Sequence, residues 1–165
     1  MKKVILYIGI LAAMISCETD VKFNNPTFEG QKNNLKWRAD ITQVTLDATN
    51  LTINAYHGLE TVTLIVPAPT GPISKANPVT FKFGTLDPAS NDIKARYVYN
   101  EDNVVLTYTT GQDLGNGEFV ITEYDFTNQT ISGSFRFNAI YQGDNTIIPK
   151  NVNFQEGFIY KIPIR

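Results

Sequence analysis

Alternation of apolar and polar residues at every second position constrains this chain more than any other feature of its sequence. Between residues 131 and 141, Ile131, Phe135 and Phe137 fall on one side of an extended chain, and Arg136 falls on the other. Side chains of a β-strand point alternately to opposite faces, whereas a helix repeats about every 3.6 residues. No window after residue 34 sustains the helical period. The pattern therefore predicts an all-β domain.

Stretches of this kind recur along the rest of the chain. They are rich in Thr, Val, Ile, Tyr and Phe and are separated by Gly, Pro, Asn and Asp. About ten strands are expected, at residues 35–39, 42–47, 51–56, 61–66, 79–83, 96–99, 104–109, 118–124, 131–141 and 152–162. In the last strand, the residues expected to face the core are Val152, Phe154, Phe158, Tyr160 and Ile162.

The segments between these strands indicate how the strands connect. Short linkers such as residues 47–50 and 125–129 predict hairpins, so consecutive strands are expected to pair antiparallel. Four prolines lie within residues 67–78, which predicts a long exposed loop because proline lacks the amide donor of a ladder. An antiparallel meander that forms a sandwich or a flattened barrel follows from this arrangement.

The start of the chain has the layout of a signal peptide. Lys2 and Lys3 form a positive beginning, an apolar run covers residues 4–13, and a small residue precedes Cys17. The run is shorter than the roughly 20 residues that cross a bilayer as a helix. Residues 14–17 resemble the lipobox of bacterial lipoproteins, which implies that Cys17 is lipidated and becomes the first residue of the mature chain. The alternative is an ordinary secretory signal with a free cysteine nearby.

These features divide the chain into three parts. We expect residues 1–16 to be the signal peptide, residues 17–30 to be the lipidated cysteine and a tether, and residues 31–165 to form one β domain. Acyl chains on Cys17 make the membrane a partner and imply an exported protein anchored at the outer membrane, on its surface or periplasmic face. With a single cysteine, neither an intrachain disulfide nor a cysteine zinc site can form.

The charge balance argues against one class of partner. The chain has 14 basic and 16 acidic residues, and cleavage of the signal peptide would remove two of the lysines. Nucleic-acid binding needs a basic patch that displaces counterions from phosphates, so no nucleic-acid partner is expected. A glycan, a small molecule or another protein remains open as the ligand.

Few residues qualify as catalytic or metal-binding. His57, the only histidine, continues an apolar alternation, which favours a strand end at a hairpin over a catalytic role. The segment from Asp113 to Glu118 loosely resembles a calcium-binding loop, but it lacks the further carboxylates of that pattern. Its Asn116-Gly117 dipeptide favours a hairpin turn instead. No nucleotide-binding, zinc or serine-hydrolase motif is present, so we assign no cofactor and no catalytic residue.

Aromatic residues at period two could line a pocket or a glycan-binding face. More often such residues fill a core, which is what we expect here. Trp37, near the start of the domain, is expected in the core as well. The aromatic residues in question are Phe81, Phe83, Tyr97, Tyr99, Tyr108, Phe135, Phe137, Phe158 and Tyr160.

Several segments together carry a resemblance to a known family. They are residues 25–30, 37–39, 117–125, 130–137 and 153–162. In these segments the chain resembles a family of uncharacterised Bacteroidetes lipoproteins, each with a short lipobox signal followed by one β-rich domain. The resemblance implies a shared β scaffold and carries over no activity and no catalytic residues.

The sequence favours a lipid-anchored β domain that acts at the cell envelope as a non-enzymatic binding or structural module. Two alternatives stay open. One is a barrel-like carrier of a small apolar ligand, which the many aromatic positions would suit. The other is a hydrolase built on carboxylates such as Glu118, Glu123 and Asp125.

Overall fold

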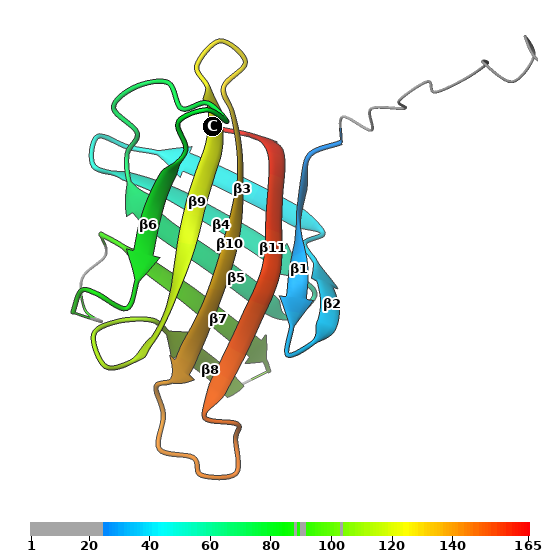
Figure 1. Cartoon of the computed structure of the whole chain (residues 1–165). Coiled ribbons are helices and arrows are strands. Elements are labelled where there is room, and N and C mark those ends of the chain that lie inside the picture. Colours follow the sequence, from blue (N-terminus) through cyan, green and yellow to red (C-terminus); the bar gives the residue numbers. More distant parts are fainter. Residues whose placement is uncertain (1–24, 88, 90–91, 103) are drawn as a thin grey trace, which may run out of the picture.

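The computed structural model describes residues 25–165 except 88, 90, 91 and 103, and the regular elements within this part are all β-strands (Figure 1). The all-β prediction is confirmed, and each expected strand is present with ends that differ by at most a few residues. The strands are β1 (Thr27–Lys32), β2 (Leu35–Arg38), β3 (Ile41–Leu46), β4 (Asn50–His57), β5 (Glu60–Pro67), β6 (Val79–Phe83), β7 (Lys94–Glu101), β8 (Val104–Thr109), β9 (Gly115–Asp125), β10 (Thr130–Tyr141) and β11 (Asn151–Pro163). A search of the described residues finds no helix able to cross a membrane.

The strands join one antiparallel sheet that curls into a half-barrel with two facing layers (Figure 1). One layer has the order β2-β1-β11-β10-β9-β6, and the other has the order β8-β7-β5-β4-β3. Strand β10 connects them, because most of it pairs with β9 while Ile140 and Tyr141 pair with the end of β8. The expected meander holds for consecutive strands such as β3-β4-β5 and β9-β10-β11. It does not hold for β1, which pairs with β11, or for β6, which pairs with β9, because these partners are not neighbours in sequence.

Strand β1 corrects the expected tether. Residues 27–30 lie in the sheet and pair with β11, so the domain begins earlier than residue 31. Phe28 is 1% exposed and packs 4.5 Å from Phe135 between ring centroids. Phe28 is the one buried residue of this short strand, which leaves too little alternation for the sequence to reveal. Residues 25 and 26 of the predicted tether precede the strand and are exposed, and the signal peptide, Cys17 and residues 18–24 lie outside the described residues.

Strand β11 contains two bulges, and they change which of its side chains face the core. Glu156 has φ 51° and Lys161 has φ 44°, and the register against β10 shifts near both residues. A bulge places two residues opposite one, so the side chains beyond it change face. Phe158 is therefore 46% exposed on the outside while Ile159 is 0% exposed in the core. The prediction that Phe158 and Tyr160 face the core is wrong.

An apolar core fills the space between the two layers. Phe137 and Phe154 stack with ring centroids 4.8 Å apart, and Ile53 and Leu64 from the other layer are 0% exposed. Trp37 is buried as expected. Each such side chain contributes about 1.5–3 kcal/mol by leaving water. Burial between the layers therefore holds the outer faces of the strands in fixed positions.

Glu60 joins the β1-β2 hairpin to the opposite layer. Its carboxylate forms an ion pair with Lys32 of β1 and accepts a hydrogen bond from the indole N–H of Trp37 on β2. Lys32 also donates to the hydroxyl of Tyr97 over 3.3 Å. The Lys32 and Glu60 side chains are only 22% and 15% exposed. Burial, together with the charge of Glu60, raises the pKa of Tyr97 far above its ordinary value of 10.0.

Candidate functional site

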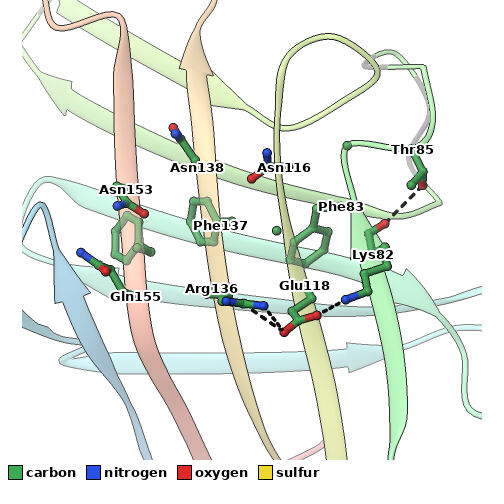
Figure 2. A pocket seen from close by; sticks show the side chains of 13 residues that line it. Lys82, Phe83, Thr85, Asn116, Glu118, Arg136, Phe137, Asn138, Asn153 and Gln155 are labelled. Atoms are coloured by element: carbon green, nitrogen blue, oxygen red, sulfur yellow. Dashed lines mark hydrogen bonds and ion pairs between the residues drawn. The ribbon is translucent and has the colours of Figure 1, made fainter.

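An open groove of about 770 Å³ lies on the β6-β9-β10-β11 part of the sheet (Figure 2). Figure 2 shows its polar side chains in front of the strands, with the second layer of the sheet behind them. We call this hollow the amide groove, because half of its polar lining residues are Asn or Gln. Its lining residues are Lys82, Phe83, Gly84, Thr85, Asn116, Gly117, Glu118, Arg136, Phe137, Asn138, Asn153, Phe154 and Gln155.

A row of three charged side chains crosses the groove. The register places Lys82 of β6 beside Glu118 of β9, and Glu118 beside Arg136 of β10. Arg136 donates from Nε to Glu118 Oε1 over 3.0 Å, and Lys82 bonds the other carboxylate oxygen. The hydrogen bond from Lys82, with the positive charges of both neighbours, holds the pKa of Glu118 below its ordinary value of 4.5. Glu118 is therefore a paired carboxylate rather than a proton donor.

Amide side chains form the neighbouring row. Asn116, Asn138 and Asn153 lie opposite one another on β9, β10 and β11. Gln155, further along β11, donates from Nε2 to Asn34 Oδ1 over 2.7 Å. The Oδ1 atom of Asn138 is buried and has no hydrogen-bond partner within the described part of the chain. Since an amide both donates and accepts hydrogen bonds, this row can pair with hydroxyl or amide groups of a ligand.

Gly117 brings β9 close to β10 within the groove, and this corrects the predicted hairpin. The chain turns earlier, at residues 111–114, and Asn116-Gly117 lies inside β9. Gly117 has φ 153°, and a Cβ there would come within 2.3 Å of the carbonyl oxygen of Arg136. The glycine is required by a close approach of two strands rather than by a turn.

His57 ends β4 at the β4-β5 hairpin, as predicted. Its Nδ1 lies 3.1 Å from Asp40 Oδ2, and its ring meets Trp37 edge to face at 5.8 Å. Its side chain is 49% exposed. Neither His57 nor Asp40 lines the amide groove.

The three carboxylates considered for a hydrolase do not share one site. Glu118 lies in the amide groove, whereas Glu123 and Asp125 line a different hollow of about 860 Å³. Asp125 accepts hydrogen bonds from the backbone of Thr127 and Asn128 in the β9-β10 turn. A search of the described residues finds no group of three His, Cys, Asp or Glu side chains placed to hold a metal ion. Glu118 therefore belongs to an ion pair and Asp125 to a turn.

Most of the predicted aromatic set fills the interior. Phe83, Tyr97, Tyr108, Phe135 and Phe137 are each at most 6% exposed. Phe81 and Tyr99 are partly buried against the same core. Side chains thus occupy space that a carrier would need for an apolar ligand. Phe158 and Tyr160 are the exceptions and lie on the outside, beyond the bulge at Glu156.

Sequence reasoning identified part of the groove without recognising it as a site. Arg136 and Asn138 belong to the alternate positions of residues 131–141 that were expected to meet water. Asn153 and Gln155 likewise fall on the exposed side of the alternation in residues 152–162. Lys82 carried no signal, because a single polar residue is ordinary in an exposed sheet face. Only pairing across strands brings these side chains together.

Fold and groove together define a half-barrel β protein with a polar hollow on the outside of one layer. The chain belongs to the family described as Domain of unknown function (DUF6252), whose profile matches residues 24–163. The match spans the whole described sheet, and it agrees with the expectation of a β-rich family without an assigned activity. Comparisons with curated proteins and with solved structures find no match.

Proposed function

We propose that this protein is an exported lipoprotein whose β domain is a non-enzymatic binding module of the cell envelope. In this proposal its ligand is polar and uncharged and binds in the amide groove. The groove supports the proposal because half of its polar lining residues are amides, which can both donate hydrogen bonds to and accept them from hydroxyl and amide groups.

The unpartnered Oδ1 of Asn138 is the observation that carries this proposal. A buried acceptor without a hydrogen bond costs about 1–3 kcal/mol. If the Asn138 amide turns into the groove, so that this oxygen accepts a hydrogen bond from a ligand hydroxyl, that cost is removed, and the neighbouring Asn116 and Asn153 would hold the same ligand from both sides. Lys82 and Arg136 both pair with Glu118, which offsets one of their two positive charges, so the charged row attracts an anion only weakly.

The anchor part of the proposal rests on residues 1–17. Their resemblance to a lipobox implies cleavage before Cys17 and attachment of several acyl chains to that residue, and two or more acyl chains hold a protein stably on a membrane. The resemblance to Bacteroidetes lipoproteins supports a position at the outer membrane. Labelled palmitate should enter the wild type and not Cys17→Ala, and an unlabelled wild type would refute the anchor.

The groove is tested by titrating the full chain, purified in detergent, with maltohexaose, xylohexaose and chitohexaose. Side-chain amide NMR signals of the groove asparagines are expected to shift with at least one of these probes. Asn138→Ala should weaken binding, whereas Asn100→Ala, on an exposed position of β7, should not. Binding that is equal in both variants, or absent for every probe, would contradict the proposal.

A further inference from the structure

Two aromatic side chains stand on the outer face of β11. Phe158 and Tyr160 have nearly parallel rings, 14° apart in plane, with centroids 6.0 Å from each other. Phe158 is 46% exposed, and the Lys161 ammonium lies 5.6 Å from the Tyr160 ring centroid. Large exposed aromatics that are held in a fixed orientation by a sheet are a common means of binding a ligand.

Three further hollows follow β11 beyond the amide groove. One of about 450 Å³ is lined by Glu156 and Phe158, the next of about 410 Å³ by Phe158 and Tyr160, and the third of about 860 Å³ by Tyr160 and Lys161. Neighbouring hollows share Phe158 or Tyr160, so they follow one another along β11. Gln155, at the end of the amide groove, directly precedes Glu156.

Together the four hollows form a line that we call the β11 track, running from Asn153 to Lys161. At a rise of about 3.3 Å per strand residue, the distance from Asn153 to Lys161 is about 25 Å. Figure 1 shows β11 (red) running along this layer with β10 on one side and β1 on the other. A linear polymer fits a series of hollows along one strand better than a compact molecule does.

The polar groups beside the rings indicate the chemistry of that polymer. The register places Glu29 of β1 beside Phe158, and Arg38 of β2 beside Glu29. The hollow between Phe158 and Tyr160 also contains Thr27, whose buried Oγ1 has no partner among the described residues. A sugar ring suits this combination, because its C–H face packs on an aromatic ring while hydroxyls at its edge bond exposed carboxylate and guanidinium groups such as those of Glu29 and Arg38.

An extended peptide suits the track less well. Strand β11 is paired on both sides, with β1 and with β10, so it offers no free backbone edge to which a peptide could add. Carboxylates and cations alternate along the track, with Arg38 3.9 Å from Glu29, so neither a strongly acidic nor a strongly basic polymer is favoured.

We infer that the β11 track binds a neutral linear glycan, with sugar rings packed on Phe158 and Tyr160 and one end of the chain in the amide groove. This inference rests on the proposed function and adds a ligand class and a second contact region to it. The aromatic pair supplies apolar contact, and the amide groove supplies hydrogen bonds. A longer glycan therefore gains affinity by reaching both regions.

Isothermal titration of the full chain in detergent tests the inference with maltose and maltohexaose, and likewise with the xylose and chitin series. Affinity should rise about tenfold or more from the disaccharide to the hexasaccharide of the series that binds. Phe158→Ala and Phe158→Leu should each lower hexasaccharide affinity by about tenfold, and Phe158→Tyr should retain it. Tyr56→Ala, a partly exposed aromatic on β4 of the other layer, is the matched control.

The outcomes separate this inference from the proposed function. If Asn138→Ala weakens binding while the Phe158 variants and glycan length have no effect, the track is refuted and the groove stands. If only the Phe158 variants weaken binding, the glycan site stands without the groove. Absence of binding to every series, or saturable binding of an uncharged peptide such as decaglycine in place of glycans, overturns the inference.

Discussion

Replacing Glu60 with alanine removes an acceptor shared by Lys32 and Trp37. The three residues connect the β1-β2 hairpin to β5, across the two layers of the sheet. Their side chains are almost enclosed, with Glu60 15% exposed and Lys32 22% exposed. The substitution therefore leaves a mostly buried ammonium and a buried indole N–H without their partner. We expect a clear loss of stability.

The size of this loss follows from the two groups left behind. Removing one partner of a buried ion pair costs about 3–5 kcal/mol, because the other charge stays buried. Water still reaches part of Lys32, so we take about 2 kcal/mol for this contribution. The indole N–H of Trp37, a residue that is 3% exposed, adds about 1 kcal/mol. A total of about 3 kcal/mol corresponds to a fall in Tm of about 6–12 °C for a domain of this size.

Urea unfolding followed by tryptophan fluorescence measures the effect directly, since Trp37 is the only tryptophan. Glu60→Gln keeps an acceptor for Trp37, so it should cost about 1 kcal/mol less than Glu60→Ala. Glu123→Ala is the control, because Glu123 makes no ion pair with any described residue. The variant Lys32→Met combined with Glu60→Gln should recover part of the loss. A Glu60→Ala protein within about 0.5 kcal/mol of the wild type would refute the reasoning.

Two further predictions concern the groove strand and its turn. Gly117→Ala should destabilise the fold by more than about 1 kcal/mol, because its Cβ would collide with Arg136 and Phe137, whereas Gly71→Ala, with nothing within 4 Å, should be neutral in thermal unfolding. Hydrogen bonds from the backbone and side chain of Asn128 lower the pKa of Asp125 below its ordinary value of 3.8. The stability this provides is complete above pH 3.8 and is lost as pH falls through the lowered folded pKa. Asp125→Asn should therefore flatten the pH dependence of the unfolding free energy below pH 3.8, and an unchanged slope would contradict this assignment.

The groove illustrates how far a sequence can lead toward a site. The alternation of residues 131–141 placed Arg136 and Asn138 on the exposed side, and the structure confirms that Arg136 is exposed and Asn138 only partly covered. The partners of these residues are distant in sequence, since Lys82 and Glu118 are 36 residues apart and still meet through β6-β9 pairing. The dipeptide Asn116-Gly117 led to a wrong prediction of a hairpin turn. Asn-Gly occurs both in tight turns and where two strands approach closely, and only the position of the neighbouring strand distinguishes these two cases.

Local alternation was enough to determine the all-β class and ten strands, because adjacent residues of a strand point to opposite faces and therefore differ in polarity. Strand β1 and the outward facing of Phe158 required the tertiary structure. Residues in β1 are held by partners far along the chain, such as Glu156, which bonds Gln31 from 125 residues away. The bulge at Glu156 reverses every later position of the alternation until Lys161 restores it. Such a reversal depends on which strand lies alongside, and that is a property of the folded sheet rather than of any short segment.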